Sequence, residues 1–174
     1  METADNKVFI TMFHKFSFKY RNKVIDSETM KSEKLVKLFT YLLMNHQRSL
    51  PSSELADMLW YFEDIDNPIG ALKNLVYRLR ALLKKEFGMS DFIPTGKGAY
   101  SINPAYTISM DVSDFDICNN DLTNAQGNEA ELYQRLIQLY RGKFLSEIKG
   151  DHNILSKSAY YHSIYIGRVI EYAN

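Results

Sequence analysis

The sequence predicts an α+β fold, in which a small antiparallel sheet, three helices and a C-terminal β-hairpin are followed by an all-helical segment. Three observations predict it. Apolar and polar residues alternate over 8–25, which is typical of strands, and apolar residues recur every three or four positions over 33–87, which is typical of amphipathic helices. Glycines interrupt residues 91–103 as they do in a hairpin, and helical spacing returns from residue 111.

The strands of 8–25 are expected to form a sheet with one face in solvent. Phe18 and Tyr20 alternate with polar neighbours, so that one face of this strand is apolar. Polar residues at 14–15 and 21–23 interrupt the alternation and predict two tight turns.

Each of the three helices that follow begins with a recognisable signal. Ser32 is a suitable N-cap for a helix over about 33–46. Residues 51–54 open a short second helix. Residues 66–68 combine a capping side chain with proline at the first helical position, which predicts a third helix over about 68–87.

The character of the sequence changes near residues 103–111, and we expect two domains, 1–106 and 107–174. The formal net charge of the chain is zero, which by itself disfavours nucleic-acid binding. The charges are nevertheless distributed unevenly. Residues 1–110 carry 15 basic and 12 acidic side chains, whereas residues 111–174 carry six basic and nine acidic side chains. The positive charge of the chain is therefore concentrated in the first domain.

The third helix has one apolar face and one basic face. Its leucines and Val76 share one side of a helical wheel and are expected in the core. The opposite side is polar, basic and aromatic, and such a face can enter the major groove of B-DNA. Residues 67–100 contain six basic and two acidic side chains. This local charge is what DNA senses, because salt screens fields beyond about 8–10 Å.

Several side chains of this region are candidate DNA contacts. Asn74 can pair bidentately with adenine, and Lys73 or Arg78 can reach guanine acceptors or phosphates. Tyr77 can contact a thymine methyl or a phosphate, and Lys97 occupies the hairpin tip. A short helix, a second helix and a hairpin in this order predict a helix-turn-helix with a wing, whose helix N-termini offer donors to phosphates. The candidate DNA-binding residues are Ser52, Ser53, Lys73, Asn74, Tyr77, Arg78, Arg80, Lys84 and Lys97.

These segments also resemble a known family of regulators. The resemblance is carried by SEKLVKLFTYLLMNHQRSLPSSELADMLW, DNPIGALKNLVYRLRALLKK and FIPTGKGAYSIN, which are similar to the OmpR-type winged helix and most closely to its SARP branch, the antibiotic-regulatory-protein-like activators. In that branch a bacterial transcriptional activator domain, a TPR-like helical array, follows the winged helix. DVSDFDICNNDL and LYRGKFL resemble the opening of that array, so the resemblance covers about residues 8–174.

The resemblance implies a function and a set of partners. It implies sequence-specific binding to repeats in double-stranded promoter DNA, by a homodimer or by protomers in tandem, and contact with RNA polymerase. The helix over 68–87 would lie in the major groove, and a wing over about 91–103 would lie on the flanking backbone or minor groove. Tyr77 and Ala81 stand where many relatives carry arginine, so a single domain is expected to bind DNA weakly. The residues at family DNA-contact positions are Lys73, Tyr77, Arg78, Arg80 and Lys97.

A stacked helical array buries its apolar faces only between neighbouring repeats. The 64 residues after Met110 provide about three helices. We therefore expect the native protein to continue beyond Asn174. We also expect the last helix, which begins near Ile154, to expose an apolar surface that can mediate self-association.

The sequence contains no pattern of catalytic residues, and we expect neither an enzyme nor a bound metal or cofactor. The four histidines are scattered without metal-ligand spacing, and Cys118 is expected to be a small core residue. A lone cysteine and the lack of a long apolar run fit a cytoplasmic protein outside the membrane. The alternative function is a protein-interaction module, in which the winged helix and the helical array bind a partner protein without DNA.

Overall fold

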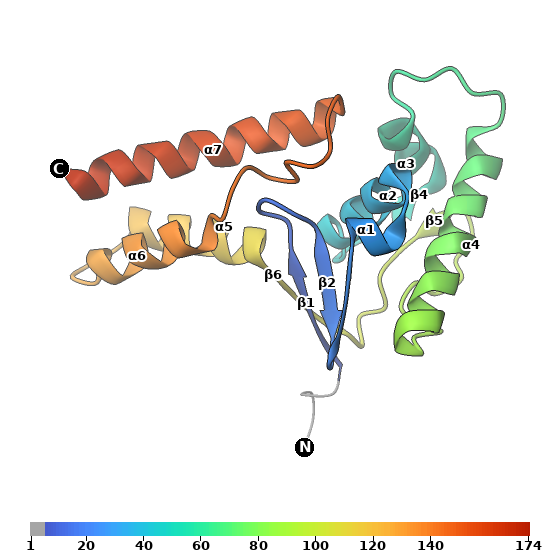
Figure 1. Cartoon of the computed structure of the whole chain (residues 1–174), viewed down its shortest axis with the longest axis horizontal. Helices are drawn as coiled ribbons and strands as arrows, with labels where there is room; N and C mark the ends of the chain where they lie inside the picture. The colour runs from blue at the N-terminus through green and yellow to red at the C-terminus, as the bar shows by residue number, and fades with distance from the viewer. Residues whose placement is uncertain (1–5) are drawn as a thin grey trace. The chain divides into compact units, whose positions relative to one another are not determined.

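A computed structural model of the protein describes residues 6–174 (Figure 1). The first five residues of the predicted 1–106 domain lie outside this range. The described part is a mixed α+β fold with a small sheet and helices, as the sequence predicts. The elements in chain order are β1 (Lys7–Thr11), β2 (Ser17–Tyr20), β3 (Lys23–Asp26), α1 (Ser27–Met30), α2 (Glu33–Met44), β4 (Leu50–Pro51), α3 (Ser52–Leu59), α4 (Pro68–Phe87), β5 (Ala99–Tyr100), β6 (Thr107–Met110), α5 (Asp111–Thr123), α6 (Glu129–Leu139) and α7 (His152–Ala173).

The chain forms two compact units. Of the described residues, unit 1 contains 6–8 together with Phe18–Ile108, and unit 2 contains Phe9–Ser17 together with Ser109–Asn174. The chain crosses between the two units after Val8, after Ser17 and after Ile108. The segment Phe9–Ser17 was expected in the first domain, but it belongs to unit 2.

The main sheet has the strand order β3-β2-β1-β6. The expected alternation is present, because Phe18 and Tyr20 of β2 are buried while Lys19 between them is exposed. The two expected turns are also present. His14 and Arg21 adopt left-handed conformations, with φ of 75° and 54°, where the chain reverses. The short helix α1 was not expected; the Asp26 carboxylate caps it by accepting a hydrogen bond from the Thr29 N–H at 2.9 Å.

Helices α2, α3 and α4 pack against one another in unit 1 (Figure 1). The Ser32 hydroxyl caps α2 by accepting from the Leu35 N–H at 3.2 Å, as the sequence predicts. Helix α4 has the predicted bounds and ends at Gly88, whose φ of 69° suits a left-handed C-cap. The residues of α4 that are buried are Leu72, Leu75, Val76, Leu79 and Leu83.

The predicted β-hairpin over residues 91–103 is wrong in its strand pairing. Only β5 forms on the C-terminal side of the expected tip, and it pairs antiparallel with β4, with Leu50 opposite Tyr100. The N-terminal side, residues 91–95, is irregular. Pro94 lies in it and has no N–H to contribute to a ladder, which disfavours a strand there.

Unit 2 is built around Phe13 at the tip of the β1–β2 connection. Its ring lies 5.2 Å from that of Phe115 in α5, 5.3 Å from that of Tyr161 in α7, and 5.0 Å from that of Tyr140, between ring centroids. These contacts place the tip in the core of unit 2. Cys118 is buried in the same unit, as expected, and its thiol donates to the Leu132 carbonyl at 3.1 Å.

Asp111 holds the backbone of this tip. Its carboxylate accepts hydrogen bonds from the N–H groups of Met12 at 2.9 Å, of Phe13 at 3.0 Å and of Val112 at 2.8 Å. Helix α5 begins at Asp111 and has no side-chain cap. Burial raises the pKa of the Asp111 carboxyl to about 6, although the three N–H donors act in the opposite direction.

Helix α7 leaves apolar side chains in solvent. Leu155 is 53% exposed and Ile170 is 55% exposed, as the sequence led us to expect for the last helix. Within residues 6–174, none of the helices is both long enough and apolar enough to traverse a membrane.

Leu79→Ala should destabilise unit 1 by about 2–5 kcal/mol, because it removes a fully buried side chain from the face of α4 that packs in the core. The free energy of unfolding in urea measures this loss. Lys73→Ala, on the exposed face of the same helix, is the control and should change stability by less than about 0.5 kcal/mol. Equal stability of the two variants would contradict the core role of Leu79.

Asp111 should make stability decrease as the pH rises. Because its pKa is higher in the folded protein than in the unfolded chain, the folded state binds the proton more tightly, and stability falls from about pH 4 to about pH 6 and is then constant. Asp111→Asn removes this titration. The difference in free energy of unfolding, wild type minus variant, should therefore fall by about 3 kcal/mol over that range. A difference that is constant or rises with pH would rule this out.

Candidate DNA-binding surface

The solvent side of α4 is polar and basic, as its spacing predicts. Lys73, Asn74 and Arg78 are exposed, and the Tyr77 side chain is 71% exposed. Tyr77 and Arg78 lie three and four residues after Asn74, so these side chains share one face of the helix. Leucines on the opposite face fix the rotation of α4, and this leaves the predicted contact residues uncovered within unit 1.

The N-terminus of α4 is fixed by its cap. The Asn67 side-chain oxygen accepts from the Gly70 N–H at 2.9 Å, and Pro68 follows at the first helical position. A side chain at position 70 would collide with this cap, since a Cβ there would lie 2.4 Å from the Asn67 Nδ2. The small residue at 70 is therefore required by the cap itself, whatever lies outside the helix.

Arg80 has a different environment from the other predicted contact residues. Its Nε donates to the Ile93 carbonyl at 2.9 Å and its Nη2 donates to the Pro94 carbonyl at 3.0 Å. The guanidinium also lies over the Tyr100 ring, 6.0 Å from the centroid. Arg80 is half-buried and joins α4 to residues 91–98, which we call the wing loop. Its geometry is that of a residue that positions this loop.

The wing loop is held from its other side by the start of α3. The Ser52 N–H donates to the Gly98 carbonyl at 2.9 Å, directly beside the pairing of β4 with β5. The sequence predicted that this N–H serves a phosphate; it is instead used within the unit, whereas Ser53 is exposed. Lys97 is exposed between the two attachments.

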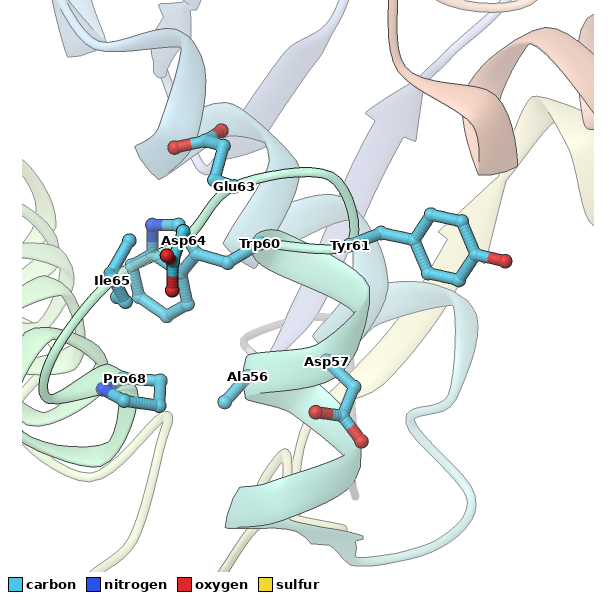
Figure 2. Close-up of a pocket in the computed structure, with 8 residues that line it drawn as sticks. All are labelled: Ala56, Asp57, Trp60, Tyr61, Glu63, Asp64, Ile65 and Pro68. Atoms are coloured by element: carbon cyan, nitrogen blue, oxygen red, sulfur yellow. The ribbon is translucent and has the colours of Figure 1, made fainter.

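The loop between α3 and α4 borders a pocket of about 310 Å³ (Figure 2). Glu63 forms an ion pair with Lys34, whose ammonium also donates to the Leu59 carbonyl at 2.9 Å and lies 5.4 Å from the Trp60 ring centroid. The negative charge of Glu63 is therefore largely compensated. Asp64 remains exposed.

Lys84 lies at the opposite end of α4, beside a hollow of about 400 Å³. Lys84 and Lys85 stand in the last turn of the helix, where cations interact favourably with the helix dipole. Arg21 of the β2–β3 turn and Lys23 at the start of β3 line the same hollow. Sequence reasoning did not connect these two basic pairs, because they are about 60 residues apart in the chain.

Known proteins resemble this chain in fold but not in detectable sequence. No family model and no curated protein match the sequence. Among solved structures, EmbR of Mycobacterium tuberculosis in complex with a low-affinity phosphopeptide matches with a TM-score of 0.75 at 14% sequence identity. The chain shares its fold with EmbR. The match covers 95% of this chain and 44% of that one, so this chain spans less than half of EmbR's length. At 14% identity, this likeness concerns the fold alone.

Arg80→Ala should release the wing loop, because two backbone carbonyls lose their donors. Amide hydrogen exchange of peptides covering residues 91–98 should become faster, and the free energy of unfolding should fall by about 1–3 kcal/mol. Arg78→Ala, an exposed arginine on the same helix, is the matched control and should leave the exchange of the loop unchanged. Unchanged exchange in Arg80→Ala would show that the loop does not depend on this residue.

Proposed function

We propose that the protein is a sequence-specific DNA-binding transcription regulator that acts as an activator. Helix α4 lies in the major groove, and the wing loop with β5 lies on the flanking backbone or minor groove. The proposal rests on one observation: one face of α4 is polar and exposed, and the other face of the same helix is buried. A rigid helix with such a face is the element that reads base edges in helix-turn-helix proteins.

Different residues of this face have different roles in the proposal. Asn74 reads adenine through its amide, which can donate and accept at the same base. Arg78 and Lys73 pair with guanine or with phosphates, and Tyr77 packs against a thymine methyl or donates to a phosphate. Lys84, further along the helix, contacts the sugar–phosphate backbone.

The wing loop contributes charge at low entropic cost. Arg80 and the Ser52 N–H hold it on both sides of Lys97, so little conformational freedom of the backbone is lost on binding. Lys97 then neutralises a phosphate beside the major-groove contact. Arg80 and Ser52 act by positioning this lysine.

The partners in this proposal are double-stranded promoter DNA and RNA polymerase. Binding of DNA repeats by two protomers, as a homodimer or in tandem, compensates for the modest charge of one α4. The contact with RNA polymerase rests on the resemblance of the sequence to SARP-type activators.

Selection of bound sequences from random DNA, followed by a salt titration on the selected site, tests the proposal. If about four to six phosphates are neutralised per unit, log K should fall against log salt with a slope of roughly −4 to −5. Lys97→Ala should weaken binding to all sequences and make the slope shallower by about one unit. Failure to enrich any motif, together with a slope near zero, would favour the protein-interaction module.

Asn74→Ala should change the preferred base at one position of the selected motif. Loss of a bidentate contact with adenine costs about 1–3 kcal/mol, so affinity for the wild-type site should fall by roughly 5–150-fold. Repeating the selection with the variant measures the change. Lys97→Ala should return the wild-type motif with lower affinity. If Asn74→Ala also returns the wild-type motif, the role assigned to Asn74 is incorrect.

A further inference from the structure

The hollow at the C-terminal end of α4 has an apolar floor and a basic rim. Tyr20 and Phe87 supply the floor, and their ring centroids are 6.1 Å apart. Among the described residues that line it, four are cationic and one, Glu86, is acidic. A ligand that fits must therefore combine an apolar body with negative charge. We call this surface the basic hollow; its cationic residues are Arg21, Lys23, Lys84 and Lys85.

The opposite end of α4 carries a surface with complementary properties. Tyr61 and Phe62, in the loop between α3 and α4, are 62% and 77% exposed, and their rings form an edge-to-face pair with centroids 4.5 Å apart. Figure 2 shows Tyr61 pointing away from the other residues that line the pocket. Asp64 and Asp66 follow in the same loop and are exposed. We call residues 61–66 the acidic aromatic loop.

We propose that the acidic aromatic loop of one copy of this chain occupies the basic hollow of another copy. The loop offers two large aromatic rings and exposed carboxylates, and the hollow offers an aromatic floor and four cations. Opposite charges on the two surfaces would steer the encounter and select the register. The acidic residues of the loop also disfavour a phosphate backbone as its partner, which leaves a cationic protein surface.

The two surfaces cannot satisfy each other within one copy. They lie at opposite ends of α4, whose 20 residues correspond to a length of about 30 Å. Since the two surfaces differ, two copies can pair through one loop and one hollow, or reciprocally through both pairs in a two-fold dimer. In both arrangements the loop of one copy meets the hollow of another, so the contact is between copies. The inference does not require DNA, so it can fail while the proposed function stands.

Sedimentation velocity of the 174-residue chain without DNA, over a range of protein and salt concentrations, tests this inference. Two double variants test the two surfaces separately. The loop variant carries Asp64→Lys and Asp66→Lys, and the hollow variant carries Arg21→Glu and Lys23→Glu. None of these four residues belongs to the proposed DNA-reading face. Lys149→Glu with Lys157→Glu, which are exposed in unit 2, is the control with the same change of net charge as the hollow variant.

We expect the wild type and the control to associate at low salt and to dissociate as salt is added. Each charge-reversed variant alone should associate at least tenfold more weakly, because like charges then meet at the contact. An equimolar mixture of the two variants should associate again, since the reversed loop of one then meets the reversed hollow of the other. Phe62→Ser should also weaken association at least tenfold without any change of charge.

The inference is overturned by any of three results. In the first, the wild type stays monomeric at low salt. In the second, the loop variant and the hollow variant each associate as strongly as the wild type. In the third, the mixture of the two folded variants fails to associate. The second result would assign self-association to another surface, such as the exposed apolar side chains of α7. Far-ultraviolet circular dichroism establishes that each variant is folded, so that loss of association is not a loss of structure.

Discussion

The packing of α4 against α2 and α3 determines what the rest of unit 1 can do. A helix has about 3.6 residues per turn, so burying Leu72, Val76 and Leu79 also fixes which residues face the solvent. A change of one residue in the apolar pattern would rotate the outer face by about 100° and would bury lysine or asparagine. The same leucines thus stabilise the fold directly. They also support recognition indirectly, because they fix the rotation of α4 about its axis and so keep Asn74 and Arg78 exposed to solvent.

The sequence predicted α4 well because the signals that define it are local. Asn67, Pro68 and Gly88 act within a few residues of themselves, and the apolar spacing lies within the helix. The division of the chain after about residue 108 could also be seen in the composition. These features need no knowledge of distant partners, and they account for most of the helix bounds and for the exposed residues of the candidate site.

The features that the sequence did not predict depend on partners far away in the chain. β5 pairs with β4 across about 50 residues, and Arg80 reaches the carbonyls of Ile93 and Pro94 through a loop that sequence pattern reads as a strand. Asp111 binds N–H groups 98 and 99 residues away. A helical wheel or a turn pattern describes only residues close together in the sequence. It places Arg80 at the edge of the apolar face, but it cannot show that the guanidinium already donates to the carbonyls of Ile93 and Pro94.

The position of Phe13 has a consequence for the order in which the chain acquires its structure. Its ring partners Phe115 and Tyr161 and the carboxylate that holds its backbone are translated more than 95 residues after it. At roughly 5–20 residues per second, the tip of the first hairpin waits several seconds for them. During synthesis the nascent chain therefore carries Phe13 without these partners, and this segment, although translated before α5 and α7, is buried only once they have been made.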